Sequence, residues 1–432
     1  MKTESKNYYL SVKEYNRMMM RRAIYLCGPL TRSSLASQLG VSLPTVTTSV
    51  ALMLEEGILI EEPYAGRPYG RPAQQIDFRP DARFAVGIDV SEKQMCGCLC
   101  NLRGGICKTW EAEPIPDDYE AMLDRMEEQI RLLIQEVPAE LLLGGGIAFN
   151  DNKYSVRTDK NGKSWDAATL KKELSARLGI RFHRGNDIRM RAIGRAMFGR
   201  CAPLTTFAYL YVSRRIVCPI VNNHRFMAAV RVTVGRIGHN IVQSDAPEYG
   251  VGADSLDATV GENALCRNGQ KLVQEGRAPH LAKMLKDGRT PNLSDLLKAR
   301  RAGDEAVAQM LDKAIKMLAL IASNVVNLIE LDFLTVDGNL FSLPEHRELM
   351  ENEIRAHLFD PNAPVDIEFL DYDGIRGAQG AAAYVIHETF LTEPEMSLKD
   401  NAEEWQLGYL QQKCAINDLK SKRQTRQGRP FW

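Results

Sequence analysis

Four small hydroxyl-bearing side chains fall together near the start of one predicted helix: Thr45, Thr47, Thr48 and Ser49. The apolar residues of the same segment recur at helical spacing, so they would be buried on the opposite side. Hydroxyl groups can bond phosphates or base edges, and a threonine methyl can touch the methyl group of thymine. An ordinary helix with a solvated face would carry the same residues. The neighbouring elements must therefore decide whether this face binds DNA.

The segments around this helix have the order of a winged helix-turn-helix. The expected elements are, in order, a helix over residues 13–27, a short helix within 30–39, a helix over 42–55, and strands over 58–61 and 75–79. Gly28-Pro29 ends the first helix, Gly40 supplies the turn after the second, and Ser42 can cap the third. We therefore expect residues 1–80 to form a DNA-binding domain in which the third helix contacts bases and Arg32 contacts the DNA backbone.

The loop between the two expected strands repeats the tripeptide Gly-Arg-Pro, at residues 66–68 and 70–72. A proline-stiffened arginine next to glycine is narrow enough for a minor groove, where A·T tracts concentrate negative potential. Arg67 and Arg71 are therefore candidates for minor-groove contacts. A turn-rich linker to the next domain would have the same composition, and the two interpretations carry equal weight.

The formal net charge is zero, from 55 basic and 55 acidic side chains, but the charge is unevenly distributed. Residues 1–80 carry +3 and residues 420–432 carry +5, which leaves −8 for residues 81–419. A basic head and tail on an acidic body suit electrostatic attraction to phosphate. The usual charged fraction of 25% and the lack of a long apolar run exclude disordered and membrane-spanning classes.

The opening sequence MKTESKNYYL is polar, which predicts a cytoplasmic protein without a secretory leader. Cys96, Cys98 and Cys100 occupy alternate positions of an expected strand, so they share one face and are predicted as small buried side chains. The nine cysteines form no Cys-x-x-Cys pair. We therefore expect no disulfides, no bound metal and no cofactor.

From Phe84 onward, strand-like and helix-like segments alternate, which is typical of an α/β fold. A similar set of segments follows after residue 205, which suggests an internal duplication with a cleft between two lobes. The expected division is a first lobe over residues 81–200 with 380–397 packing back on it, a second lobe over 201–379, and a basic C-terminal extension over 398–432.

Several segments, taken in order, resemble the ROK family, which is named for repressors, open reading frames and sugar kinases. They are GPLTRSSLASQLGVSLPTVTTSVALMLEEGIL with the following GRP, then GIDV, GNDIRMRAIG, GRIGHNIV and GAQGAAAYVIHE, within residues 13–395. The first of them is similar to the winged helix-turn-helix of the repressor branch. The resemblance implies an actin-like, two-lobed sugar-kinase body, usually assembled into dimers.

Both phosphate-binding loops of the kinases in this family are altered here. Asp89 is retained, but residues 90–93 read Val-Ser-Glu-Lys where ATP-binding members have a glycine turn and a threonine. Residues 213–219 contain no glycine where the family alternates glycines. Side chains at these positions would block the close backbone approach that a phosphate needs. We therefore expect no phosphoryl transfer and no catalytic residue.

The sugar-binding motifs of the family are matched in part. Asn186 and Asp187 match the motif that contains the family's aspartate base. In the Gly-Glu-x-Gly-His motif, Arg236 replaces the sugar-binding glutamate and His239 is retained, while Asp257 falls where another sugar-binding glutamate would lie. The resemblance thus implies an effector site made of these five residues. His239 is either a sugar contact or a packed remnant, because the cysteines that would share its zinc ion are missing.

Basic side chains replace the lost groups near the expected cleft: Arg189, Arg214, Arg215 and Arg236. Guanidinium groups bind carboxylates and phosphates through paired hydrogen bonds, so the expected effector is a sugar phosphate or a sugar acid. The alternative is a cleft without a ligand, in a repressor that responds to another protein or to no effector.

These patterns predict a transcriptional regulator, a repressor in carbohydrate metabolism, that binds double-stranded operator DNA as a homodimer or a higher oligomer. The main alternative is an ATP-dependent sugar kinase fused to a DNA-binding domain, and a third is a DNA-tethered scaffold for another protein. The C-terminal extension carries a third Gly-Arg-Pro at residues 428–430. It is interpreted either as a solvated terminus or as a further contact to DNA or to the acidic body.

Overall fold

The chain divides into two compact units in the computed structural model. The first contains Met1–Leu204 and Gly374–Trp432, and the second contains Thr205–Asp373. The structure describes residues 12–63, 74–90, 94–149, 156–199, 206–222, 225–226, 235–242, 254–285, 288–329, 331–371 and 373–392. Within these stretches, no helix combines the length and apolar character needed to span a membrane.

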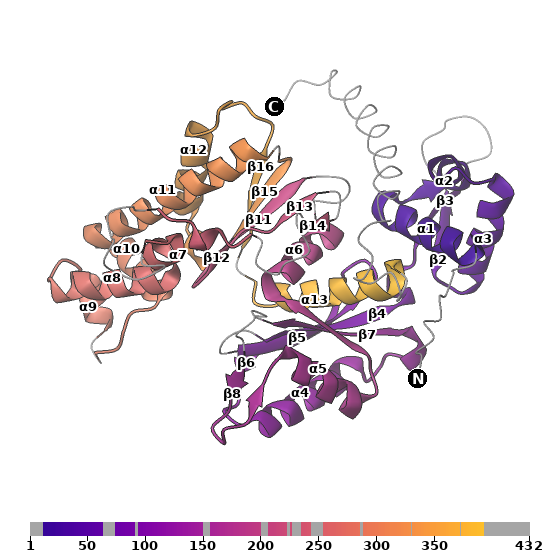
Figure 1. The fold of residues 1–432 in the computed structure, drawn as a ribbon, viewed down its shortest axis with the longest axis horizontal. Helices are drawn as coiled ribbons and strands as arrows, with labels where there is room; N and C mark the ends of the chain where they lie inside the picture. Colours follow the sequence, from indigo (N-terminus) through magenta and orange to yellow (C-terminus); the bar gives the residue numbers. More distant parts are fainter. Residues whose placement is uncertain are drawn as a thin grey trace, which may run out of the picture. The chain divides into compact units, whose positions relative to one another are not determined.

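The first unit begins with a winged helix-turn-helix, called here the winged head (Figure 1). Its elements are α1 (Val12–Cys27), β1 (Leu30–Thr31), α2 (Arg32–Leu39), α3 (Leu43–Glu55), β2 (Leu59–Pro63) and β3 (Gln74–Phe78). The strands form an antiparallel sheet in the order β1-β3-β2. The three expected helices and the two expected strands are confirmed. The sequence pattern does not show β1, because a strand of two residues is too short for periodicity.

Local capping explains where α2 and α3 begin and where α2 ends. The Thr31 side chain accepts a hydrogen bond from the Ser34 amide, and the Ser42 side chain accepts one from the Thr45 amide. Gly40 follows α2 with a φ of 65°, a left-handed conformation that glycine adopts without steric cost. These caps fix the turn that places α3 after α2.

The remainder of the first unit is a mixed sheet with helices on both faces (Figure 1). Its strand order is β10-β7-β4-β5-β6, with bounds Phe182–Asn186, Leu142–Phe149, Phe84–Val90, Gln94–Asn101 and Ile106–Pro114. The helices are α4 (Tyr119–Ile134) and α5 (Ala167–Leu178) on one face, and α6 (Asp187–Phe198) and α13 (Arg376–Ile386) on the other. The short elements are η1 (Pro80–Ala82), η2 (Ala139–Leu141), β8 (Arg157–Thr158), β9 (Ser164–Trp165) and the π-helical turn η5 (His387–Leu391).

Helix α13 packs so closely against the sheet and α6 that backbone atoms of these elements are in contact. A Cβ on Gly87 of β4 would lie 1.8 Å from the Ala378 carbonyl oxygen, and a Cβ on Gly380 would lie 2.2 Å from the Met190 carbonyl oxygen. Only glycine fits at either position. The whole of α13 belongs to the first unit, so the return of the chain begins earlier than the expected residue 380.

Strand β5 carries the three alternating cysteines, and all three are buried. Cys98 and Cys100 are 0% exposed and Cys96 is 5% exposed. They pack in the hydrophobic cluster that also contains residues of α13. The prediction that they act as small core residues is confirmed.

The second unit repeats the strand order of the first. Its strands lie in the order β14-β13-β11-β15-β16, with bounds Arg225–Phe226, Ile220–Asn222, Phe207–Val212, Phe333–Asp337 and Asp366–Phe369, and β12 (Ile216–Val217) pairs with β11. Counted along the chain, both units have the order 3-2-1-4-5, with an antiparallel first part and two parallel last strands. This shared topology supports the expected internal duplication.

The helical part of the second unit is divided into separate helices around one hydrophobic core. They are α7 (Leu256–Val260), α8 (Glu262–Gln274), α9 (Pro279–Met284), α10 (Leu293–Arg301), α11 (Glu305–Leu328) and α12 (Pro344–Ala356), with short turns η3 (Ile237–His239) and η4 (Asn339–Ser342). Gly276 ends α8 with a φ of 70°. Glycine and proline thus interrupt what the apolar periodicity alone presents as one long helical region.

Candidate DNA-binding and effector sites

Helix α3 presents an uncharged face with hydroxyl groups to solvent. Thr47 and Thr48 are exposed and Thr45 is half-buried. The Thr47 hydroxyl donates to the Leu43 carbonyl at 2.9 Å, and the Thr48 hydroxyl donates to the Pro44 carbonyl at 3.0 Å. Because their hydrogens are used inside the helix, these two threonines offer methyl groups and acceptor oxygens to a partner. Such groups suit the methyl of thymine and the amino donors of adenine and cytosine.

Ser49 does not belong to this exposed face, which corrects the expectation from sequence. It is 6% exposed and lies with the buried residues of α3. Ser49 comes three residues after Val46 and four before Met53, and that spacing places it on the buried side of a helix. It therefore cannot reach a base from its position in the structure.

Leu43, at the first position of α3, is a candidate that the sequence pattern does not single out. Its side chain is 50% exposed, and it is the one large apolar residue of the described winged head that is exposed to this extent. Single exposed leucines are common on protein surfaces. Leu43 lies one helical turn before Thr47 at the N-terminal end of α3, and in winged helix-turn-helix proteins bound to DNA this end of the helix contacts bases in the major groove.

Of the three arginines expected to contact DNA, only Arg32 lies within the described residues. Arg32 is half-buried and forms an ion pair with Glu61 of β2. It would have to exchange this partner for a phosphate. Arg67 and Arg71 lie outside the described residues, as does the basic C-terminal extension.

Asn186 and Asp187 lie at the junction of β10 and α6 in the first unit. The Asn186 side chain accepts a hydrogen bond from the Arg189 amide at 3.1 Å and so caps α6. Asp187 is 9% exposed. In the same unit, the buried Asp89 of β4 accepts a hydrogen bond from Arg191 at 2.9 Å. Arg191 follows Asp187 by one helical turn, a spacing that could have indicated it.

Asp89 is the aspartate that this chain retains from the first phosphate motif of the family, and its surroundings are crowded. Burial raises the pKa of Asp89; Arg191 opposes this rise and Asp187 adds to it. A Cβ on Gly377 of α13 would lie 1.8 Å from Oδ2 of Asp89. This carboxylate is therefore enclosed by its own unit and held by an arginine.

The second unit brings together three of the expected effector residues, Arg236, His239 and Asp257. Burial raises the pKa of Asp257, whereas the Ile216 amide and the nearby charges of His239, Arg215 and Arg236 lower it. Arg236 is half-buried and His239 is exposed. These four side chains, Arg215, Arg236, His239 and Asp257, are called here the Arg236 cluster. The cluster joins a carboxylate, a group that can accept hydrogen bonds from hydroxyls, with guanidinium groups, which can bind anions.

The second phosphate loop of the family is closed by its own neighbours in this chain. The Ile216 amide donates to Oδ1 of Asp257 at 2.7 Å. The Ser213 hydroxyl donates to Glu262 at 3.1 Å, and the Ser213 carbonyl accepts from the Glu262 amide at 2.9 Å. In a phosphate-binding loop, backbone amides like that of Ile216 would point at the nucleotide. Here the carboxylate of Asp257 occupies one of them.

The described residues contain no group of three or more histidine, cysteine, aspartate or glutamate side chains arranged to hold a metal ion. Of the five expected effector residues, the first unit holds Asn186 and Asp187, and the second unit holds the other three. Each group is gathered within its own unit.

Comparison with known proteins identifies relatives that include both regulators and kinases. Residues 85–388 match the ROK family. The DNA-binding transcriptional dual regulator NagC of Escherichia coli K12 is 22% identical over 262 residues, which are 59% of this chain and 64% of NagC. The N-acetylglucosamine repressor of Shigella flexneri matches to the same extent. The alignment thus spans a little under two thirds of these curated relatives.

Solved structures that share the fold include a regulator and a kinase. A ROK family transcriptional regulator, a homolog of the E. coli MLC protein, has a TM-score of 0.68 at 16% identity and covers 88% of this chain and 98% of its own. The ROK hexokinase from Thermus thermophilus has a TM-score of 0.56 at 18% identity, and covers 70% of this chain and 97% of its own. The match to the ROK family model extends over more than half of the residues of this chain, and the chain therefore belongs to the ROK family.

Proposed function

We propose that this ROK protein is a sequence-specific DNA-binding transcriptional regulator that acts as a repressor. The observation that carries the proposal is the uncharged, hydroxyl-bearing face of α3 in a winged helix-turn-helix. Relatives that are themselves a repressor and a dual regulator support it. A homodimer would place two α3 helices in successive major grooves, about one helical turn apart, with Arg67 and Arg71 in the flanking minor grooves.

Selection of bound duplexes from a random pool by the full chain tests this function directly. We expect an enriched sequence with two inverted half-sites, because a symmetric dimer reads a symmetric site. The double variant Thr47→Ala, Thr48→Ala should lose the enrichment, while Lys172→Ala on the distant α5 should keep it. Failure of the full chain to enrich any sequence would overturn the proposal.

For the effector, we propose a small anionic carbohydrate held at the Arg236 cluster. Asp257 would accept hydrogen bonds from sugar hydroxyls, while Arg236 and Arg215 would bind a phosphate or carboxylate on the same molecule. The Ile216 amide, which donates to Oδ1 at 2.7 Å, holds the Asp257 carboxylate in place. Gly238 leaves room for this carboxylate, because a Cβ there would lie 2.0 Å from Oδ1. A cluster with only carboxylates would favour neutral sugars, whereas the two arginines favour an anionic ligand.

A thermal-shift series with hexose phosphates, sugar acids and the corresponding neutral hexoses tests the effector class. Ligands that bind only the folded state raise the melting temperature with concentration. We expect stabilisation by the anionic compounds, lost in Arg236→Gln and kept in Arg277→Gln, an exposed arginine of the same unit that pairs with Glu275. Stabilisation by neutral hexoses alone would contradict an anionic effector.

We further propose that the chain does not transfer phosphate, although kinases are among its structural relatives. The supporting observations are the Asp89–Arg191 pair and the use of the Ile216 amide by Asp257. In an assay with ATP and a panel of hexoses, sugar phosphate should form no faster with the protein than without it. Measurable turnover that disappears in Asp187→Asn would favour the alternative, a sugar kinase fused to a DNA-binding domain.

A further inference from the structure

We infer that Arg103 and Tyr25 lock the winged head onto the α/β part of the first unit, so that this part sets the direction of α3. The consequence for operator binding rests on the proposed function, whereas the lock itself does not. Arg103 and Tyr25 act as positioning residues, since neither lies on the exposed face of α3.

In the lock, the α/β part donates a hydrogen bond to the winged head, and the winged head donates one to the α/β part. Arg103, in the turn between β5 and β6, donates to the Tyr25 carbonyl of α1 at 3.0 Å and forms an ion pair with Asp77 of β3. Its guanidinium carbon lies 5.1 Å from the ring centre of Tyr25 and 5.5 Å from that of Phe78, within the range of cation–π attraction. In return, the Tyr25 hydroxyl donates to the Leu102 carbonyl at 2.8 Å. One arginine thus binds both α1 and β3.

A second attachment holds α1 to the end of α13. Nε of Arg22 donates to the Leu391 carbonyl at 2.5 Å. The Phe390 ring meets the Phe78 ring edge-on at 5.4 Å, and the Arg21 guanidinium lies 5.2 Å from the centre of the Phe390 ring. The π-helical turn η5, which carries Phe390 and Leu391, therefore packs against the winged head.

The winged head shares a hydrophobic core with the α/β part of the first unit, and the chain that connects them is itself hydrogen-bonded rather than a free linker. Ile24 and Phe78 of the winged head share one hydrophobic cluster with Cys98 of β5 and Ala382 of α13. Between β3 and β4, the Arg79 amide donates to the Ile58 carbonyl at 2.9 Å, and the Leu102 amide donates to the Pro80 carbonyl at 2.9 Å. A connection of this kind resists rotation about the chain, because each of its hydrogen bonds would have to break.

For a dimer with two winged heads, such rigidity determines which operator spacing is bound. Once one half-site is bound, a rigid second head meets its half-site at a high effective concentration, but only at the matching spacing. A loosely held head would tolerate several spacings and gain less from the second half-site. Arg103 would then influence operator choice without touching DNA.

The lock is tested first without DNA, by hydrogen exchange on the full chain. Arg103→Met keeps the aliphatic stem but removes the charge, and Tyr25→Phe removes only the hydroxyl. The matched control is Arg157→Met, because Arg157 lies over Phe149 and Trp165 of the same unit, at 4.8 and 5.3 Å from their ring centres, away from the winged head. We expect faster exchange in α1 and β3 in the first two variants, and unchanged exchange there in the control.

The second measurement compares binding to a single half-site, to the selected operator, and to operators lengthened or shortened by one or two base pairs. Arg103→Met should keep half-site affinity, lose about tenfold on the full operator and discriminate less between spacings. Protection of α1 and β3 that is unchanged in both lock variants would overturn the inference. Equal losses on the half-site and the full operator would also overturn it. A full chain that binds no DNA would refute the proposed function, while hydrogen exchange would still decide the lock.

Discussion

Leu43 and the threonines beside it would offer methyl groups rather than charges to the proposed DNA partner. From Leu43 to Leu54, α3 carries no charged side chain, so it lacks the arginine or lysine that most often reads guanine. Thymine has a methyl group in the major groove that cytosine lacks. At the scale of single residues, this favours reading of A·T pairs by contact between methyl groups.

Leu43→Ala should lower affinity for the selected operator about tenfold, because burying a leucine side chain contributes ~1.5 kcal/mol or more. Replacing the contacted thymidine by deoxyuridine removes only the methyl group and should weaken the wild type but not the variant. Leu132→Ala is the matched control, since Leu132 of α4 is also 50% exposed. Equal sensitivity of Leu43→Ala and wild type to deoxyuridine would exclude this contact.

His346 is a buried histidine whose lowered pKa should make the stability of the protein depend on pH. It is 0% exposed, and its Nδ1 lies 2.6 Å from the Leu340 carbonyl oxygen. Burial lowers the pKa of His346; the Leu340 carbonyl opposes this, Arg300 adds to it, and Glu345 and Asp312 oppose it. The folded state therefore holds the neutral ring, with Nδ1 as the donor.

Because this folded pKa is lowered, the unfolded chain binds the proton more readily, and stability should fall as pH drops below ~6.5, the ordinary histidine value. Chemical denaturation of the full chain between pH 5 and 7.5 measures the slope. His346→Gln should lower stability at pH 7.5 and flatten the dependence on pH. The exposed His357→Gln at the end of α12 should leave both unchanged. An unaltered slope in His346→Gln would assign the pH dependence to other groups.

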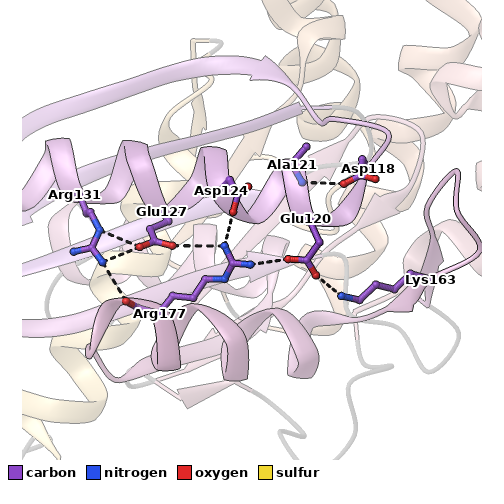
Figure 2. A network of polar contacts seen from close by, with 8 residues as sticks. All are labelled: Asp118, Glu120, Ala121, Asp124, Glu127, Arg131, Lys163 and Arg177. Atoms are coloured by element: carbon purple, nitrogen blue, oxygen red, sulfur yellow. Dashed lines mark hydrogen bonds and ion pairs between the residues drawn. The ribbon is translucent and has the colours of Figure 1, made fainter.

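At the scale of elements, ion pairs tie α4 to α5, the two helices that cover one face of the first sheet. Figure 2 shows Arg177 of α5 between three carboxylates of α4. Arg177 lies 2.6 Å from Glu120, 2.6 Å from Asp124 and 3.6 Å from Glu127. Lys163 and Arg131 extend the network at its two ends. One ordered guanidinium serves several partners, so its side-chain entropy is lost only once.

Arg177→Met should lower the free energy of unfolding by about 1 kcal/mol, and the loss should shrink in 1 M salt because the pairs are partly exposed. Lys172→Met makes the same change of charge on α5, at an exposed position, and should cost less. Denaturant titrations at low and high salt measure both variants. A loss that is independent of salt would point to packing of the arginine stem rather than to its charge.

At the scale of the whole molecule, the basic excess of the first 80 residues does not come from the described winged head. There, Arg17 pairs with Glu56, Arg32 with Glu61, and Asp77 with Arg103. The excess comes from residues 1–11, with Lys2, Lys6 and Glu4, and from the loop that contains Arg67 and Arg71. That loop and the basic C-terminal extension are therefore the largest candidate sources of positive charge for a DNA backbone. The zero net charge thus says little about whether and how the protein would bind DNA.

The double variant Arg67→Gln, Arg71→Gln should reduce the slope of log affinity against log salt by about two, one unit for each lost phosphate contact. Removal of residues 420–432 separates the two sources of charge and should leave the slope unchanged if that extension is only solvated. Titrations of operator DNA at several salt concentrations measure both. An unaltered slope in the double variant would favour the interpretation of the loop as a linker.

The local parts of the winged head could be predicted because neighbouring residues determine them. Ser42, Gly40 and the apolar stripe of α3 predict where its helices start, turn and bury a face, and the structure confirms each. Ser49 shows the limit: its residue type suggested a surface role, while its helical position placed it inside. Leu43 shows the converse, an apolar residue that the fold leaves exposed.

The sequence alone determined the order of elements, the resemblance to a family and the altered phosphate loops, because these depend on residue types at short spacing. Only the tertiary structure decided that Asp89 faces Arg191, that Asp257 takes the Ile216 amide, and that Arg103 holds Tyr25 and Asp77 together. These contacts join residues that are 26 to 102 positions apart. Such pairs form only when packing of the sheet and helices brings distant segments together, and no local pattern records that packing.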